Sequence, residues 1–395
     1  MDPRKNPYSP GAGTPPKELA GRDEIIEKAN VALDRIRMGN PARSLIFYGL
    51  RGVGKTVLMN QIRRNAEAKG AFSVWIEAPE NRSLPASLAP PLRAALLRIS
   101  RTKAVQRQAQ HALVALAGFI KAVKLKYGDI EIGLDVAAEP GLADSGDLAA
   151  DLADLLKAAG EAARANKTAI ILYIDELQYV EETQLGSLIS ALHSASQAQL
   201  PIVLMAAGLP QLLAMTGRAK SYSERLFEFV KVDRLDEEAA RKALIIPAQK
   251  NNVRFEEAAV REMIEQTQGY PYFLQEWGKH SWDLAVRTPI SEKDARNATM
   301  SALAELDASF FRVRFDQLTP AQKQYMRAMA ELGFGPHRSG DIAEKLKRKL
   351  TSVAPIRNAL IAKGMLYSPA HGDTAFTVPL FDGFMKRIMP RFEPD

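Results

Sequence analysis

The feature that most constrains this chain is a glycine-rich stretch at residues 49–56, GLRGVGKT, which follows the pattern G-x-x-x-x-G-K-[ST]. The apolar run before it, residues 44–48, is typical of a strand, and residues 57–62 are typical of a helix. Such a loop lets backbone N–H groups close around phosphate oxygens, while its lysine reaches the outer phosphates and its last hydroxyl binds Mg²⁺. A turn that only joins a strand to a helix is the alternative, and the strand–loop–helix setting weighs against it. We therefore expect ATP and Mg²⁺ to be held by Gly49, Leu50, Arg51, Gly52, Val53, Gly54, Lys55, Thr56 and Val57.

A second apolar run, residues 169–174, ends in the two carboxylates of Asp175 and Glu176. An uninterrupted apolar run is typical of a buried parallel strand, whose carboxyl end lies at the same edge of the sheet as the glycine-rich loop. Asp175 would complete the Mg²⁺ shell with Thr56, and Glu176 would polarise the attacking water beside the charge of Lys55. The two motifs together predict an ATPase, which hydrolyses a phosphoanhydride.

Composition narrows the class of protein. A chain of 395 residues with 46% apolar and 25% charged residues is long enough for two or three domains. It has no cysteine, which excludes disulfides and thiol chemistry, and its five histidines are so scattered that a metal cluster is not expected. No apolar run approaches the roughly 20 residues of a membrane span, and the polar N-terminus does not resemble a signal peptide. These features predict a cytoplasmic protein that does not enter a membrane.

The order of patterns predicts an α/β fold, with a parallel sheet, a helical lid and a C-terminal winged helix. Strands and helices alternate up to about residue 233, and the alternating apolar residues of Ala122–Val136 predict a small β-hairpin between helices. Beyond that point the pattern is helical, with Gly269-Tyr270-Pro271 at a helix start. The predicted domains are an extended or disordered arm at 1–20, the sheet core at 21–233, the lid at 234–305 and the winged helix at 306–395.

The winged-helix segment carries much of the positive charge. Residues 306–395 hold 14 lysines and arginines against 9 aspartates and glutamates, a net charge of +5. We expect Lys347, Arg348 and Lys349, just before the third helix of the segment, to lie on DNA phosphates. Arg357 would be exposed on that helix and reach a base edge. A contact with a protein partner, or a basic face that is only solvated, is the alternative.

Taken together, these motifs resemble the AAA+ branch of the P-loop ATPases, in particular the archaeal origin-recognition type and the related STAND signalling ATPases. Residues 19–23, LAGRD, look like the motif that opens such domains. The resemblance implies that Arg22 and Pro271 flank the adenine of ATP or ADP. It also implies that Arg225 is an arginine finger aimed at a neighbouring subunit, which would make the protein a homo-oligomer. A local ion pair of Arg225 with Glu224 or Glu228 is the alternative.

Two positions depart from that family. The polar sensor expected after the fourth strand would fall at residues 205–207, which are Met-Ala-Ala, and the lid motif at residues 269–275 has no arginine or lysine. We therefore expect slow ATP turnover. The favoured function is a nucleotide-dependent DNA-binding switch. A STAND-type signalling ATPase whose winged helix contacts protein, and a helper ATPase of a transposase, remain as alternatives.

Overall fold

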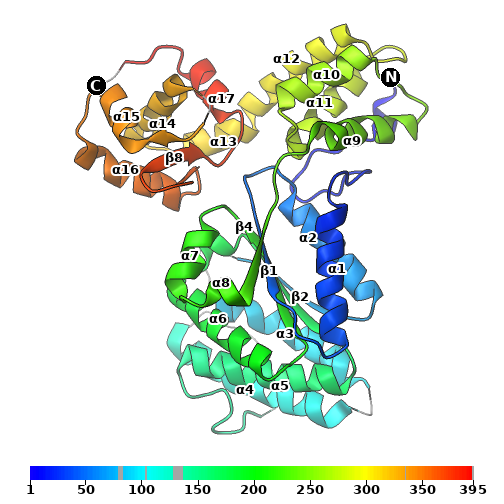
Figure 1. The fold of residues 1–395 in the computed structure, drawn as a ribbon, viewed down its shortest axis with the longest axis vertical. Coiled ribbons are helices and arrows are strands. Elements are labelled where there is room, and N and C mark those ends of the chain that lie inside the picture. The colour runs from blue at the N-terminus through cyan, green and yellow to red at the C-terminus, as the bar shows by residue number, and fades with distance from the viewer. Residues whose placement is uncertain (79–82, 103–104, 128–136, 334, 394–395) are drawn as a thin grey trace.

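The computed structural model describes residues 1–78, 83–102, 105–127, 137–333 and 335–393 and shows an elongated molecule (Figure 1). The five-stranded sheet and its helices lie at one end, and the lid and the C-terminal segment lie side by side at the other. The strands are β1 (Ser44–Tyr48), β2 (Phe72–Glu77), β3 (Ile170–Asp175), β4 (Ile202–Gly208), β5 (Phe227–Lys231), β6 (His337–Arg338), β7 (Leu366–Tyr367) and β8 (Asp373–Phe376).

The α-helices are α1 (Asp23–Arg37), α2 (Lys55–Ala68), α3 (Leu84–Ser100), α4 (Gln106–Tyr127), α5 (Leu148–Ala165), α6 (Glu182–Gln197), α7 (Leu212–Ala219), α8 (Ser223–Leu226), α9 (Glu237–Gln249), α10 (Glu257–Thr267), α11 (Pro271–Leu284), α12 (Glu292–Ala308), α13 (Phe310–Asp316), α14 (Pro320–Leu332), α15 (Ser339–Lys345), α16 (Leu350–Ala362) and α17 (Phe381–Ile388). The described residues also include the short 3-10 helices η1 (Pro3–Lys5) and η3 (Leu177–Tyr179). Across the described residues, every helix is too short or too polar to serve as a membrane span.

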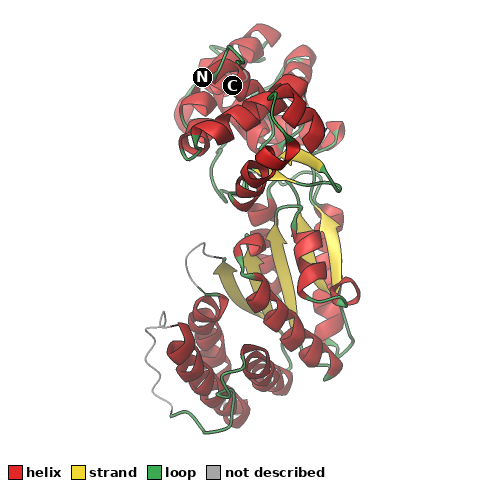
Figure 2. Ribbon diagram, turned by 90° about the vertical axis from the view of Figure 1, so that its left-hand side faces the viewer, coloured by secondary structure: helices red, strands yellow, loops and turns green. Residues whose placement is uncertain are grey.

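The large sheet is wholly parallel, with the strand order β2-β3-β4-β1-β5. Its strands are nearly continuous apolar runs because helices cover both faces. Alternate residues face opposite ways, so Leu45 and Phe47 join the core on the side of α1 and α2, while Ile46 joins the core on the side of α3 to α6. Figure 2 shows helices on both sides of the sheet, which confirms the predicted α/β fold. Because the strands are parallel, the carboxyl ends of β1 and β3 lie at one edge.

The predicted β-hairpin at Ala122–Val136 is wrong in the part that the structure describes. Residues 122–127 continue α4 as helix, and residues 128–136 lie outside the described residues. Residues 123 and 125 are about 200° apart around a helix, so they point to opposite sides of α4. Val123 is buried, whereas Leu125 is exposed, as expected when only one of the two meets the core.

The proline-rich N-terminal arm packs along the lid helices and is not separate from the fold. Tyr8 is buried and its hydroxyl donates to the carbonyl oxygen of Leu244 in α9. The side-chain amide of Asn6 donates to the carbonyl oxygen of Lys279 and to the carboxylate of Asp283, at 3.0 and 2.8 Å, both in α11. The arm's short 3-10 helix, η1, begins at Pro3, where the fixed φ of proline suits the first position of a helix.

The C-terminal segment contains three helices and a small sheet in the order α14-β6-α15-α16-β7-β8, followed by α17. Its three strands pair antiparallel in the order β6-β8-β7, which leaves the turn between β7 and β8 as the wing. The three helices, β7 and β8 agree with the prediction from the sequence, whereas β6 and α17 were not predicted. The segment from 320 to 388 is called the winged helix below.

The winged helix contacts the loop between β1 and α2, residues 49–54. The backbone N–H of Arg51 donates to the carbonyl oxygen of Thr377 at 2.9 Å. Gly364, which ends the turn after α16, lies so close to this loop that an added Cβ would stand 3.1 Å from the Arg51 guanidinium and 3.3 Å from the Tyr179 hydroxyl. The last segment of the chain is therefore docked on the edge of the sheet that carries the sequence motifs.

Candidate nucleotide-binding site

The glycine-rich loop bends closely over the end of the sheet before α2 begins at Lys55. Gly49 is required there, because a Cβ at this position would stand only 2.0 Å from the carbonyl oxygen of Val232. The loop then delivers Lys55 and Thr56 into the first turn of α2, where unpaired backbone N–H groups and the helix dipole favour an anion. This is the setting that a phosphate-binding loop needs.

Lys55 is buried and donates to two carbonyl oxygens of its own loop. Its ammonium nitrogen lies 2.9 Å from the oxygens of both Gly49 and Leu50. Burial lowers the pKa of Lys55 to about 8, although the carboxylates of Glu176 and Asp175 oppose this shift. An anion at this position would relieve the cost of burying the charge.

Thr56 and Asp175 form the part of the site suited to a metal ion. The Thr56 hydroxyl donates to Asp175 Oδ2 at 2.6 Å, and the N–H of Glu176 donates to Oδ1 at 2.9 Å. Asp175 is buried at the end of β3, and burial raises its pKa despite the bond from Thr56. A hydroxyl and a carboxylate at this distance are the hard oxygen donors that Mg²⁺ prefers, so the residues present fit the ion.

Glu176 is held in a left-handed backbone conformation, with φ +52° and ψ +38°, at the start of η3. A side chain other than glycine rarely adopts this conformation, which clusters at functional sites. One Glu176 oxygen lies 3.9 Å from the Arg51 guanidinium, and the other accepts a hydrogen bond from the side-chain amide of Gln178. The fold thus fixes the carboxylate beside the phosphate loop.

Gln178 is a residue that the sequence analysis missed. Its side-chain oxygen accepts from the backbone N–H of Leu209 at 3.0 Å, just beyond the end of β4, while its amide nitrogen bonds Glu176. The sensor position on β4 itself is apolar, as predicted, because Met205, Ala206 and Ala207 are buried. A polar side chain nevertheless reaches this end of β4 from η3, because Gln178 lies two residues beyond Glu176.

Lys55, Thr56, Asp175 and Glu176 line one cavity of about 780 Å³, a volume suited to a nucleotide. The predicted residues in its wall are Arg22, Arg51, Gly52, Val53, Gly54, Lys55, Thr56, Val57, Asp175, Glu176 and Pro271. Gly49 and Leu50 shape the loop from behind. Arg22 uses its guanidinium to hold the carbonyl oxygens of Val53 and Asp233, at 3.1 and 2.6 Å, so it braces the loop from within the cavity wall.

Two further parts of the wall were not predicted. Residues of the N-terminal arm, including Gly13 and Thr14, pass over Thr56 and close one side of the cavity. Arg314, on α13 between the lid and the winged helix, enters from another side. Its guanidinium lies 4.1 Å above the Phe310 ring and donates to the Phe310 carbonyl at 2.6 Å. Burial lowers the pKa of Arg314 to about 10, helped by the nearby charge of Arg51.

Arg225 lies away from this cavity. It belongs to α8, which precedes β5, and the parallel register with β1 places it at the edge of the sheet opposite the phosphate loop. Its side chain is exposed and, among the described residues, forms no ion pair with Glu224 or Glu228. Glu228 instead accepts from Lys28 at 2.7 Å. The alternative, a local ion pair of Arg225 with Glu224 or Glu228, is therefore not found among the described residues.

The predicted DNA contacts lie on the winged helix, with one correction. Lys347 and Lys349 are exposed and Arg348 is half-buried in the turn between α15 and α16. Arg357 is half-buried rather than exposed, because its guanidinium donates to the Thr374 and Ser368 hydroxyls at 2.8 and 2.9 Å. It joins α16 to the wing, and those bonds would have to break before it reached a base.

The parallel sheet, the phosphate loop and the paired carboxylates together form the fold of an AAA+ P-loop ATPase. In agreement, residues 18–205 match the family model described as the AAA ATPase domain. Residues 308–385 match a family described only as a domain of unknown function.

Known proteins resemble the chain at low identity. An uncharacterized HTH-type transcriptional regulator of Methanocaldococcus jannaschii is 27% identical over 122 residues, 31% of this chain and 29% of that protein. The Walker-type ATPase of Pyrococcus abyssi has a similar fold, with a TM-score of 0.58 and 16% identity over 94% of this chain and 97% of that one. The Aeropyrum pernix ORC1 protein in complex with DNA has a TM-score of 0.49 and a sequence identity of 14% to this chain, over 94% of each chain.

Proposed function

We propose that this protein is a nucleotide-dependent switch, in which the state of the ATP site sets the position of the winged helix. The observation that carries the proposal is the bond from the Arg51 N–H, in the phosphate loop, to Thr377 of the winged helix. Arg51 also donates to the Tyr179 hydroxyl at 2.8 Å, next to Glu176 and close to Gly364. A rearrangement of the loop around phosphates would act directly on these contacts.

ATP hydrolysis in this proposal uses the residues that the site brings together. Lys55 stabilises the charge of the outer phosphates, Thr56 and Asp175 hold Mg²⁺, and Glu176 orients and polarises the attacking water. Arg22 and Pro271 would flank the base. Turnover would be slow in a single chain, because β4 offers only apolar residues at its sensor position and Arg225 faces away from its own cavity. Arg225 would act only on a neighbouring subunit.

Replacing Glu176 by Gln tests this assignment. Glu176→Gln should bind ATP as the wild type does but hydrolyse it about 100-fold or more slowly, because only the water-polarising carboxylate is lost. Nucleotide binding is measured by calorimetry and phosphate release by a coupled assay. Glu182→Gln, which changes an exposed carboxylate paired with Arg218, is the matched control. Wild-type turnover in Glu176→Gln would reject Glu176 as the base.

The switch is proposed to control the binding of the winged helix to double-stranded DNA. Support comes from the exposed Lys347 and Lys349 beside Arg348, and from the relative named as an HTH-type transcriptional regulator. Each phosphate that these cations neutralise would release counterions and make binding depend on salt.

The test replaces Lys347, Arg348 and Lys349 together by Ala. The variant should bind all duplex sequences more weakly, and the slope of log affinity against log salt should flatten by up to about 3 units. Fluorescence anisotropy at several salt concentrations, with ATP and with ADP, measures both. A triple change of Lys121, Lys124 and Lys157 to Ala removes the same charge from α4 and α5, at the far end of the molecule (Figure 1), and should have no effect.

A STAND-type signalling ATPase, whose winged helix contacts protein, is the second candidate. The face of α16 favours it, because Leu350, Ala354 and Pro355 are exposed there and Arg357 is engaged by the wing. An exposed face of small apolar residues suits a protein surface better than DNA. If the protein binds no DNA with either ATP or ADP, the DNA-binding switch is rejected and the STAND-type ATPase takes its place.

A further inference from the structure

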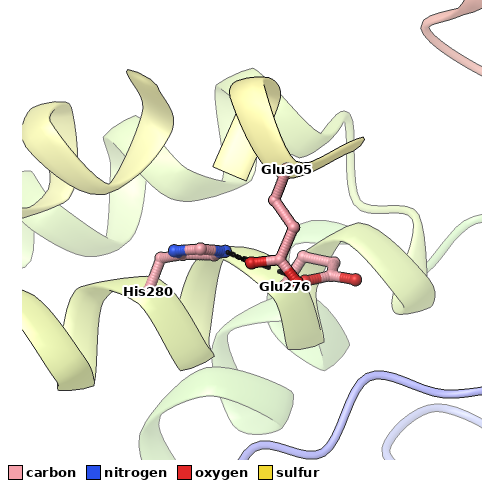
Figure 3. A group of neighbouring side chains, drawn as sticks. All are labelled: Glu276, His280 and Glu305. Atoms are coloured by element: carbon pink, nitrogen blue, oxygen red, sulfur yellow. Dashed lines mark ion pairs between the residues drawn. The ribbon is translucent and has the colours of Figure 1, made fainter. Parts of the chain in front are cut away.

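A cluster of three ligand-type side chains lies inside the lid, apart from the nucleotide cavity. Glu276 and His280 are one helical turn apart on α11, and Glu305 faces them from α12 (Figure 3). His280 Nε2 is 3.0 Å from Glu305 Oε2 and 4.0 Å from Glu276 Oε2. One ligand atom from each side chain lies within 4.8 Å of the others. The spacing of Glu276 and His280 by four residues places both on one face of the helix.

Two of these side chains are buried, and one oxygen of Glu276 is left without a hydrogen bond. The side chains of Glu276 and His280 are 7% and 10% exposed. Among the described residues, Glu276 Oε2 forms no hydrogen bond, whereas His280 Nε2 faces the Glu305 carboxylate at 3.0 Å. A buried carboxylate oxygen without a hydrogen-bond partner is costly, so its presence calls for an explanation.

The other atom of each of the two groups is held by a hydroxyl. Glu276 Oε1 accepts from the Tyr272 hydroxyl at 2.8 Å, and His280 Nδ1 lies 3.1 Å from the Ser301 hydroxyl. Such outer hydrogen bonds fix the orientation of metal ligands and leave the inner atoms aimed at the ion. They are the second feature, besides burial, that distinguishes this cluster from surface acids.

We propose that Glu276, His280 and Glu305 bind a divalent transition-metal ion, of which Zn²⁺ is the best fit. One imidazole nitrogen with two carboxylate oxygens is a donor set of intermediate softness, suited to Zn²⁺ rather than to Mg²⁺ or Ca²⁺. The two carboxylates supply the two negative charges that balance the ion.

Lys279 is the neighbouring cation with which the ion would compete. Its ammonium lies 3.3 and 3.2 Å from the two oxygens of Glu305. The side chain is 31% exposed, so it can turn to solvent when the ion takes its place beside Glu305. The rival explanation of the cluster is a proton shared by His280 and Glu305 without any metal.

The proposed ion site is connected to the wall of the nucleotide cavity through Tyr272. This residue bonds Glu276 through its hydroxyl, while its backbone N–H donates to the carbonyl oxygen of Gly52 in the phosphate loop at 3.1 Å. Its ring stacks on Phe310 at 4.9 Å. The site is thus a clamp between α11 and α12 that holds one side of the cavity.

The experiment titrates the full-length protein, treated with a chelator and then freed of it, with Zn²⁺ by calorimetry and with Co²⁺ by visible absorption. ADP and Mg²⁺ are kept saturating so that Asp175 does not compete. We expect one ion per chain, with Co²⁺ bands typical of nitrogen and oxygen ligands, because the chain has no thiolates. His280→Ala and Glu305→Gln should each weaken binding at least about tenfold. His371→Ala, in the exposed wing, is the matched control and should bind as the wild type does.

The outcome decides between the ion and the shared proton. Absence of saturable Zn²⁺ binding in the wild type, or equal affinity in Glu305→Gln, overturns the proposal. If His280→Ala fails to fold, Glu305→Gln still decides, because its side chain is 50% exposed and ADP affinity reports its fold. An ion found only at Asp175 by anomalous diffraction overturns the proposal as well.

Discussion

Lys55 must be both buried and charged, two demands that conflict in the folded chain. Burial depresses its pKa to about 8, below that of an unfolded lysine, so the free protein gains stability as the pH rises from about 8 to 10. A bound phosphate favours the ammonium and raises the pKa again. Nucleotide binding therefore takes up a proton in this pH range.

This linkage predicts that ATP affinity is constant below about pH 8 and falls above it. The fall should approach, and not exceed, about tenfold per pH unit, since one proton is involved. Calorimetry from pH 7 to 10, in buffers of different ionisation enthalpy, measures the affinity and the proton uptake together. An affinity that stays level to pH 10 would show that Lys55 is charged in the free protein throughout.

Arg314 is the residue from which we expect the largest unpredicted effect on nucleotide binding. It faces the same part of the cavity as Glu176 and Arg51, where the outer phosphate would lie. Arg314→Ala should weaken ATP binding about tenfold to a hundredfold, the range expected for one hydrogen bond to a charged group, and should weaken ADP binding less. Competition with a fluorescent nucleotide measures both.

Arg312→Ala is the matched control for this prediction. Arg312 lies on the same helix but is exposed and paired with Asp316 at 3.1 Å, outside the cavity. Equal ATP affinity in the two variants would remove Arg314 from the site. If Arg314→Ala weakens the binding of ATP and ADP equally, Arg314 contacts an inner phosphate.

At the scale of elements, the structure of short local stretches could be predicted from the sequence. Contacts between residues far apart in the sequence could not. The phosphate loop, β3 and its two acids follow from short stretches, because the strand, the turn and the helix N-terminus each have their own sequence signal. Gln178 could have been found too, since it lies only two residues beyond Glu176. Arg314 could not, because nothing in the sequence says that α13 folds back over a loop some 260 residues earlier.

The same limit explains the two elements that the sequence analysis described incorrectly or incompletely. The apolar alternation after residue 122 has the period of a strand, but in α4 only Val123 of the pair Val123 and Leu125 meets the core, and packing decides the outcome. The arm before residue 20 has no pattern of its own. Its order comes from Tyr8 and Asn6, whose partners lie on α9 and α11, more than 200 residues away.

The arm should control how fast nucleotide leaves. Tyr8→Ala removes the buried anchor of the segment that passes over Thr56, and a lost core aromatic costs about 3–5 kcal/mol of local stability. We expect faster dissociation of both ATP and ADP, by about tenfold or more, measured by stopped-flow fluorescence. Lys5→Ala, exposed on the same arm, is the control. Unchanged dissociation in Tyr8→Ala would mean that the arm does not cover bound nucleotide.

At the scale of the whole molecule, the winged helix contacts the phosphate loop. Among the described residues, this contact includes the bond from the Arg51 N–H to the Thr377 carbonyl and the close approach of Gly364 to Arg51, Tyr179 and Leu209. The proposed switch requires these contacts to open while both parts stay folded.

Gly364→Ala should weaken this docking. The added methyl group would stand 3.1 to 3.4 Å from Arg51, Tyr179 and Leu209, and the backbone φ of +64° adds strain of about 1 kcal/mol. Gly372→Ala is the control, because its φ of +82° brings a comparable strain while its surroundings are open to 4 Å. A fluorophore pair on the winged helix and α6 should report a longer distance in Gly364→Ala alone, without nucleotide. If the proposed switch is right, DNA affinity without nucleotide rises in the same variant. If the fluorophore distance increases but DNA affinity does not change, Gly364 is part of the docking contact, and the coupling of that contact to DNA binding is rejected.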